Sequence, residues 1–367
     1  MAKIALHLTG GGARGSYQAG VLKALSEILN ARTLPFSVLT GVSVGSLNAA
    51  ILCEYADDFK MGVEKVVNLW ENIHCDDVFY AQNYLLGRSL FRNIAHFFIV
   101  NPRPTHLLDT SPLFNFVKEH IHFDRINENI AKGLVETFEI ITHCYESQKT
   151  ISFYEQQSAF NDWHYTRHIS NKTELGLEHI LASSAIPFFF PPKLINKAHY
   201  GDGSIGLLSP LRGALRFKAD KIFVISTRHL LTADDVENLK AKDIGFAHVL
   251  GSLLNGLFVD NLDRDIELVN RMNDVILTMS RWKKRNYPWR YVETLHMRPS
   301  ISISKVAQTD YHVLPKLLKV MLNLLGTQSG ELLSFLLFEP TFTKELIQLG
   351  YDDTMQAADM ITEFFKA

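Results

Sequence analysis

The stretch KIALHLTGGGARGSYQAGVLKAL, residues 3–25, decides the fold class. An apolar, strand-like run over Lys3–Thr9 leads into three consecutive glycines, and an amphipathic run over Ser16–Leu29 predicts a helix. A buried strand that ends in glycines and turns into a helix is typical of α/β proteins. The sequence therefore predicts an α/β fold with a mostly parallel central sheet flanked by helices.

The same alternation of strand and helix patterns continues along the chain. Further strands are predicted at Phe36–Thr40, Phe138–Cys144, Thr150–Tyr154 and Lys221–Ser226, and further helices at Ser46–Tyr55 and Leu177–Ala185. Strands that are separated by helices pair in parallel through right-handed crossovers. This part of the chain, residues 1–300, is predicted to form one large domain.

The pattern becomes helical beyond residue 300. One apolar stripe consists of Leu314, Leu317, Leu318, Met321, Leu324 and Leu325, and a second covers Leu346–Lys366. We expect residues 301–367 to form a small helical C-terminal appendage that packs on the core.

Composition excludes several classes of function. The 367 residues are 47% hydrophobic, which suffices for a large core, and the net charge of −2 argues against nucleic acid as a partner. Cys53, Cys75 and Cys144 are too few for a disulfide framework and are expected to be buried, idle thiols. We find no signal-peptide pattern and no apolar run of the ~18 residues that a membrane span needs. The expectation is a cytoplasmic protein with peripheral membrane contact.

The first glycine cluster has the spacing Gly10-x-Gly12-x-x-Gly15, which matches the dinucleotide-binding fingerprint. That function also requires an acidic residue at the end of the second strand, to bind the ribose hydroxyls. The second strand ends in LTG at residues 39–41, without an acid. The loop is therefore interpreted as a site for a different negative charge.

The sequence GVSVG at residues 41–45 has the GxSxG pattern and lies between a predicted strand and a small-residue helix. This is the context that places a nucleophilic serine, here Ser43, on a sharp turn. A serine nucleophile needs main-chain donors for the oxyanion, and the glycine turn that opens a helix supplies them. We expect the strand before Gly10 to pair in parallel beside the strand before Ser43.

The general base is predicted to be a carboxylate. The fifteen histidines have no distinctive local setting, and the 42 residues before Ser43 leave room for only two strands, too few for an α/β-hydrolase order of Ser, acid and His. Asp202 lies in the tight turn GDGS, residues 201–204, after an extended segment. It is the best-placed candidate.

Four motifs in this order resemble the patatin-like phospholipase family over residues 3–228. They are GGGARG (10–15), GVSVG (41–45), ASSAIP followed by FPP (182–187 and 190–192), and DGS (202–204). The resemblance implies a three-layer fold and hydrolysis of phospholipids or other acyl-ester lipids without metal or cofactor. It makes Ser43 the nucleophile and Asp202 its general base, a dyad without histidine.

The resemblance also assigns the supporting positions. The backbone amides of Gly11, Gly12 and Ala13 would form the oxyanion hole, and Arg14 would order that loop. The motif glycines that complete the pattern are Gly10, Gly15, Gly41, Gly45 and Gly203. Two positions depart from the family: Ser204 replaces the usual Gly or Ala, and Ser209 replaces the usual Asn before proline.

Two other functions remain open at this point. The first is a serine hydrolase of another class, such as a thioesterase or a peptidase that uses Ser43. The second is a non-catalytic lipid-binding protein on the same fold, against which the intact Ser43 and Asp202 argue.

Two segments are candidates for contact with lipid. Residues 72–125 are rich in aromatics and prolines, so they are predicted either to cover the site as a lid or to pack into the fold. Residues 281–290, RWKKRNYPWR, interleave cations with aromatics, which suits an anionic lipid surface. The alternative for the second segment is a solvated loop whose aromatics cover an edge of the core.

Overall fold

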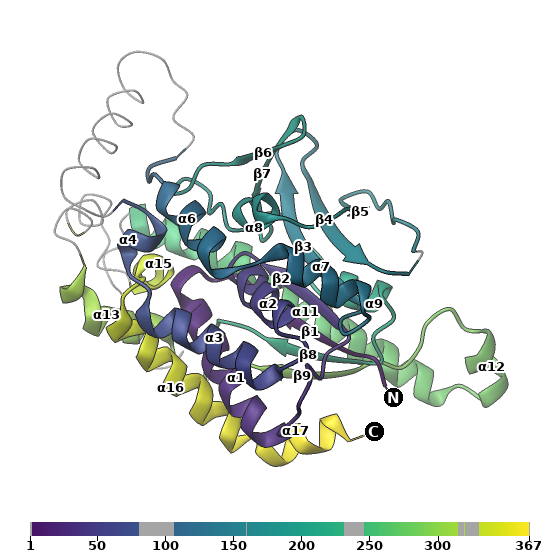
Figure 1. Cartoon of the computed structure of the whole chain (residues 1–367). Coiled ribbons are helices and arrows are strands. Elements are labelled where there is room, and N and C mark those ends of the chain that lie inside the picture. The colour runs from purple at the N-terminus through teal and green to yellow at the C-terminus, as the bar shows by residue number, and fades with distance from the viewer. Residues whose placement is uncertain are drawn as a thin grey trace.

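The computed structural model describes residues 2–80, 106–158, 160–230, 246–314, 319 and 330–366 (Figure 1). The strands of this part are β1 (Ile4–Leu8), β2 (Val38–Val42), β3 (Thr137–Cys144), β4 (Lys149–Gln156), β5 (His168–Lys172), β6 (Lys193–Ile195), β7 (Ala198–Asp202), β8 (Lys221–Ile225) and β9 (Glu293–Met297).

The helices that precede the last strand are α1 (Ser16–Leu29), α2 (Val44–Glu54), α3 (Phe59–Asn72), α4 (Cys75–Val78), α6 (Ser111–His120), α7 (Phe123–Ala131), α8 (Leu177–Ser183), α9 (Arg212–Arg216), α11 (Phe246–Thr278) and α12 (Arg281–Asn286). Those that follow it are α13 (Ile303–Thr309), α15 (Gly330–Leu336), α16 (Pro340–Gln356) and α17 (Ala358–Phe365). Short 3₁₀ helices of the described part are η1 (Gly12–Gly15) and η3 (Asp310–Val313).

The strands of the described part form one sheet. Its main order is β5-β4-β3-β2-β1-β8-β9, and β7 pairs with both β3 and β6. Five neighbouring pairs (β1–β2, β1–β8, β2–β3, β4–β5 and β8–β9) are parallel. The pairs β3–β4, β3–β7 and β6–β7 are antiparallel. The mostly parallel sheet between helices confirms the predicted fold class, and the predicted helix Ser16–Leu29 coincides with α1.

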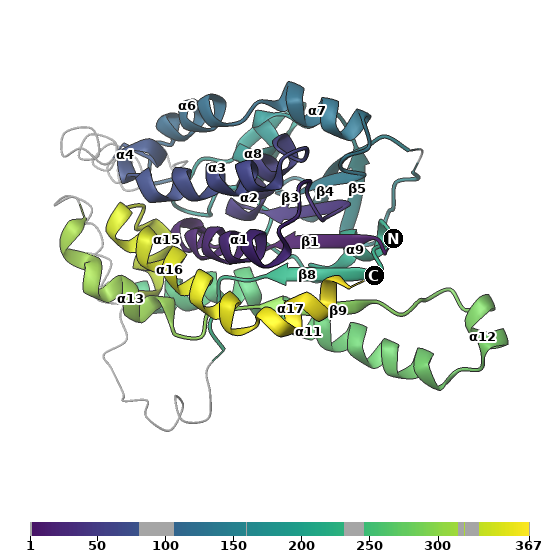
Figure 2. The ribbon, with the colours of Figure 1, turned by 60° about the horizontal axis from the view of Figure 1, so that its bottom comes forward.

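Both faces of the sheet are covered, because apolar side chains alternate between two cores. On β8, Phe223 and Ile225 join the core under α1, α2 and α3, whereas Ile222 and Val224 join the core under α9 and α11. Figure 2 shows the two helical layers on either side of the sheet. Strands buried on both faces read as continuous apolar runs, which is why they were recognisable in the sequence.

The C-terminal helix α16 packs directly on α1, as Figure 2 shows. A Cβ atom at Gly350 of α16 would collide with the carbonyl oxygen of Tyr17 on α1, so the two backbones are in contact. The Tyr17 hydroxyl also donates a hydrogen bond to Asp353 of α16, at 3.0 Å. The stripe Leu346–Lys366, expected as one helical pattern, is divided into α16 and α17 at Ala357. Most of the stripe that begins at Leu314 lies outside the described residues.

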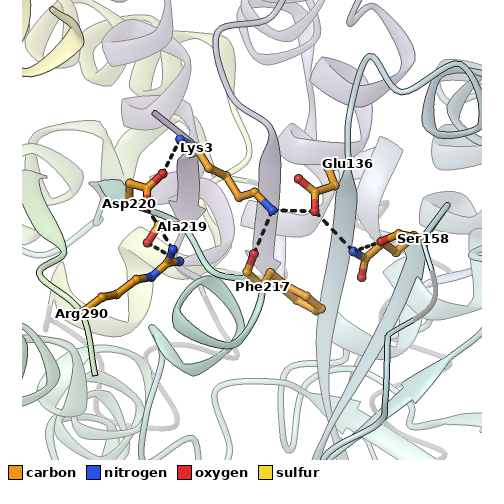
Figure 3. Close-up of polar contacts among 8 residues, drawn as sticks. Lys3, Glu136, Ser158, Phe217, Ala219, Asp220 and Arg290 are labelled. Atoms are coloured by element: carbon orange, nitrogen blue, oxygen red, sulfur yellow. Dashed lines mark hydrogen bonds and ion pairs between the residues drawn. The ribbon is translucent and has the colours of Figure 1, made fainter. Parts of the chain in front are cut away.

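A polar network ties together the amino ends of the parallel strands (Figure 3). The Lys3 amide, just before β1, donates to the Asp220 carboxylate before β8 at 2.8 Å, while the Lys3 ammonium reaches Glu136 before β3. Arg290, which leads into β9, donates to the same Asp220 carboxylate at 3.0 Å. This network does not involve the opposite edge of the sheet, where the parallel strands have their carboxyl ends. That edge is therefore available to form a site.

Two observations concern membrane-spanning helices and the cysteines. Within the described part, no helix combines the length and the apolar character that a membrane crossing demands. Cys53, Cys75 and Cys144 are buried and unpaired, as expected from the sequence.

The contact between α1 and α16 generates a stability prediction. Gly350→Ala forces the two helix backbones apart, and we expect the free energy of unfolding to fall by about 1–3 kcal/mol, the usual cost of overpacking. Urea denaturation measures the change. Gln356→Ala, at an exposed position of the same helix, is the matched control and should change stability by less than about 0.5 kcal/mol. A Gly350→Ala variant as stable as the control would contradict the close packing.

Candidate active site

Ser43 lies on a sharp turn between β2 and α2. Its backbone has φ 53° and ψ −127°, a conformation that is strained for a residue with a side chain and typical of functional turns. The flanking Gly41 and Gly45 are buried, and the side chain of Ser46 donates a 2.6 Å hydrogen bond to the Ser43 carbonyl. The GxSxG pattern therefore has the strand, turn and helix that its chemistry requires.

Asp202 is the last residue of β7 and is fully buried. Its Oδ1 accepts a 2.9 Å hydrogen bond from the Ser204 amide. Burial raises the pKa of Asp202 to about 6, and the side chains of Ser43 and Ser204 act in the opposite direction by stabilising the charged form. Its Oδ2 has no partner of standard hydrogen-bond geometry among the described residues, so the contact with Ser43 is a loose one. Catalytic hydrogen bonds often tighten only when the substrate binds.

Pairing of β7 with β3 brings these two residues together. Asp202 lies opposite Thr142 on β3, and β3 is the parallel neighbour of β2, the strand that ends just before Ser43. Two residues that are 159 positions apart in the chain thus meet at the carboxyl edge of the sheet.

Ser183, at the end of α8, connects the two turns. Its hydroxyl accepts a 2.8 Å hydrogen bond from the Ser43 amide and donates one of 2.6 Å to the Ile141 carbonyl. Its own carbonyl accepts a longer bond of 3.4 Å from the Gly203 amide. The sequence of the surrounding ASSAIP segment does not predict this role of Ser183, because nothing local indicates which backbone groups its hydroxyl reaches.

The glycine loop after β1 lies beside the turn that carries Ser43. β1 and β2 are parallel with Leu8 opposite Gly41, as expected from the sequence. The amides of Gly11, Gly12 and Ala13 have no hydrogen-bond acceptor in the described part of the chain, and they precede or open η1. Unpaired amides at the start of a helical turn are ready donors for an anion.

Arg14 holds the glycine loop against the C-terminal region. Its guanidinium donates to Ser334 and Glu331 of α15 at 2.8 and 2.9 Å, and it stacks 3.9 Å from the ring centre of Phe335. The Arg14 side chain is buried, whereas the Glu331 side chain that it binds remains 38% exposed. Gly10 and Gly15, which flank the loop, are buried as well.

An apolar pocket adjoins Ser43. It encloses about 440 Å³, including part of its opening to solvent, and Ser43 and Gly12 both line it. Most of its remaining wall consists of apolar side chains contributed by several elements, among them Leu47, Leu113, Phe190 and Phe338. No histidine is among the described residues that line it. Such a lining suits an apolar group next to the serine hydroxyl.

The two predicted lipid-contact segments lie at different ends of the molecule. In the first segment, residues 81–105 are outside the described part, while α6 and the last residue of α4 contribute to the pocket wall. In the second segment, α12 lies at the opposite end of the sheet from α4 and α6 in both ribbon views (Figures 1 and 2).

The fold and this site define an α/β protein with a strained serine between a parallel strand and a helix. A family model described as patatin-like phospholipase matches residues 6–215. The chain therefore belongs to the patatin-like phospholipase family, a family of lipid hydrolases.

Among solved structures, VipD from Legionella pneumophila is similar at 14% identity with a TM-score of 0.37, and the match covers 98% of this chain and 67% of that one. Human GIVD cytosolic phospholipase A2, bound to methyl γ-linolenyl fluorophosphonate, matches at 12% identity with a TM-score of 0.45. That match covers 99% of this chain and 59% of the human chain, so the present chain spans little more than half of that relative. No curated protein matches the sequence.

Ser183 generates a prediction for the site. Ser183→Ala leaves the Ser43 amide and the Ile141 carbonyl without their partner, so we expect a stability loss of about 1–3 kcal/mol and slower labelling of Ser43 by a fluorophosphonate probe. Ser183→Thr keeps the hydroxyl and should restore labelling. Thr354→Ala, which removes a buried hydroxyl of α16 that bonds the Gly350 carbonyl, is the control for stability alone. Equal labelling of the Ser183→Ala and Thr354→Ala variants would contradict a positioning role.

Proposed function

We propose that this protein hydrolyses the acyl-ester bonds of lipids as a phospholipase A or lysophospholipase, with Ser43 as nucleophile and Asp202 as general base. The observation that carries the proposal is the meeting of Ser43 with a buried carboxylate at the wall of an apolar pocket. Family membership supports the lipid-hydrolase class, and the dyad and the reaction steps are our inference.

The first half of the reaction forms an acyl-enzyme. Asp202 takes the proton of the Ser43 hydroxyl as its oxygen attacks the ester carbonyl. The oxyanion accepts hydrogen bonds from the free amides of Gly11, Gly12 and Ala13, and loss of one such donor typically costs about 10²–10³ in turnover. The proton on Asp202 passes to the departing alcohol, here the lysolipid or glycerol oxygen, and the acyl group remains on Ser43.

The second half releases the fatty acid. Asp202 removes a proton from a water molecule, whose oxygen attacks the acyl carbonyl through the same oxyanion site. The Ser43 oxygen then leaves and recovers its proton from Asp202, which restores the free enzyme. The apolar pocket holds the acyl chain through both halves, and each methylene that it buries contributes about 0.8 kcal/mol.

Two alternatives share the same fold. A thioesterase or peptidase would use the same dyad, but the apolar wall beside Ser43 favours an acyl chain over a peptide backbone, which needs hydrogen-bond partners. A non-catalytic lipid-binding protein would have no use for a strained serine turn directed at a buried carboxylate. Substitution of Ser43 and Asp202, together with a panel of substrates, tests both alternatives.

Substitution of either dyad residue should abolish hydrolysis. We expect Ser43→Ala and Asp202→Asn each to lower kcat by at least about 10³-fold with little change in KM, because the dyad acts in the chemical step. Ser26→Ala, at a half-buried position of α1, and Asp57→Asn, at an exposed position, are the matched controls and should keep full activity.

The assay compares phospholipids, p-nitrophenyl esters of different chain length, acyl thioesters and peptides. Full esterase activity in a folded Ser43→Ala variant would refute the mechanism. A wild-type enzyme that prefers thioesters or peptides would select the first alternative. No turnover and no labelling by a fluorophosphonate probe would select the lipid-binding alternative.

The titration of Asp202 should set the acid limb of activity. A general base works only when it is ionised, so kcat/KM for an uncharged ester is expected to be constant above pH 6 and to fall about tenfold per pH unit below it. The Ser204 side chain lowers the pKa of Asp202, although its hydroxyl makes no hydrogen bond of standard geometry among the described residues, so Ser204→Ala should move this limb to higher pH. Initial rates between pH 4 and 9, with stability checked at each pH, measure the shift. An acid limb that stays in place in Ser204→Ala would contradict this role.

A further inference from the structure

The segment between α11 and β9 projects from the body of the protein. We call residues 275–291 the tip segment; it contains the end of α11, all of α12 and the chain that returns to the sheet (Figure 2). Its base is fixed by Asn273, whose side chain donates to the Val292 carbonyl and accepts from the Val292 amide at 2.7 and 3.0 Å. Arg290 adds the ion pair with Asp220 (Figure 3). The projection is therefore held at its base while its far end extends into solvent.

The charge of the tip segment differs from that of the whole chain. Its sequence, VILTMSRWKKRNYPWRY, carries five cations and no acid, although the chain has a net charge of −2. Of these cations, Arg290 is paired with Asp220. Lys283, Lys284 and Arg285 reach no acidic side chain in the part of the chain that the structure describes. A concentrated positive patch on a mildly acidic protein favours an anionic partner.

Large apolar side chains are exposed beside these cations. Trp282 is 74% exposed, Trp289 57% and Leu277 60%. Trp282 and Trp289 are therefore mostly exposed and do not cover an edge of the core, whereas Tyr287 is half-buried. The remaining two of the four tryptophans, Trp70 and Trp163, are buried.

We infer that the tip segment docks on an anionic phospholipid surface. Its tryptophans would lie at the level of the lipid headgroups, where amphipathic rings are most stable, and its lysines and arginine would contact the phosphates. Binding to nucleic acid would use the cations but would leave Leu277 and both tryptophan side chains without an apolar environment. The combination of unpaired cations and exposed apolar side chains favours a bilayer surface.

The tip segment is separate from the candidate active site. Ser43 and its pocket lie at the carboxyl ends of the strands, whereas the tip segment projects beyond their amino ends, as both ribbon views show. Docking through the tip segment therefore attaches the protein to a membrane and does not deliver lipid to the pocket. This inference is independent of the proposed catalytic function.

The test uses the full chain with Ser43→Ala, so that no lipid is consumed. Binding to vesicles of phosphatidylcholine alone, and of phosphatidylcholine with phosphatidylserine in equal parts, is measured by co-sedimentation at low and high salt. We expect binding only to the anionic vesicles, weakening with salt. A blue shift of tryptophan emission should accompany it, and because Trp70 and Trp163 are already buried, the shift reports Trp282 and Trp289.

Charge removal gives the decisive comparison. Lys283→Gln, Lys284→Gln and Arg285→Gln together should weaken binding roughly 100-fold, since each cation near an anionic surface contributes a factor of about five. Lys60→Gln, Lys65→Gln and Lys132→Gln remove the same charge from exposed positions elsewhere and should leave binding unchanged.

Three results would overturn the inference. The first is equal binding by the two triple variants. The second is failure of the parent protein to bind anionic vesicles at low salt. The third is the finding that the tip segment does not bind vesicles and instead mediates self-association of the protein or binding to an acidic protein.

Discussion

The site depends on the parallel pairing of β1 with β2, in a register that sets Leu8 opposite Gly41. Parallel neighbours end at the same edge of a sheet, so the glycine loop and the serine turn leave the sheet side by side. The glycine loop and the serine turn are not neighbours in the sequence, where 27 residues separate Gly15 from Ser43. A single register thus brings main-chain donors and a hydroxyl group into one pocket wall.

The pocket is completed by a part of the chain that lies outside the family match at residues 6–215. Phe338 lines the pocket, and Glu331 and Ser334 hold the buried guanidinium of Arg14. A Cβ atom at Gly12 would collide with the Phe335 carbonyl, so this loop also touches the backbone of the C-terminal region. The helices after residue 330 are therefore structural neighbours of the candidate site as well as a cover for α1.

The sequence predicted the parts of the fold that local patterns encode. The apolar runs that predicted strands correspond to β1, β2, β3, β4 and β8, and the helix Ser16–Leu29 has a clear apolar face, so these elements could be located before the structure was known. The shorter or more polar strands β5, β6, β7 and β9 were not predicted. The role of Ser183 could not be predicted, nor could the partners of Arg14, because both residues contact groups far away in the chain. For Arg14 the family resemblance implied only that it orders the glycine loop. The 33-residue helix α11 was also not predicted, and its exposed face interrupts any simple apolar pattern.

Burial of Asp202 has opposite effects on its charge and on its strength as a base. An aspartate in water has a pKa near 4 and is a weak base at neutral pH, whereas a carboxylate that is fully dry would be protonated and inactive. Removal from water raises the pKa of Asp202 to about 6, and the hydroxyls of Ser43 and Ser204 and the Ser204 amide limit that increase. The carboxylate therefore stays ionised at neutral pH while its basicity exceeds that of an exposed aspartate. In the proposed mechanism this balance replaces the histidine of a triad.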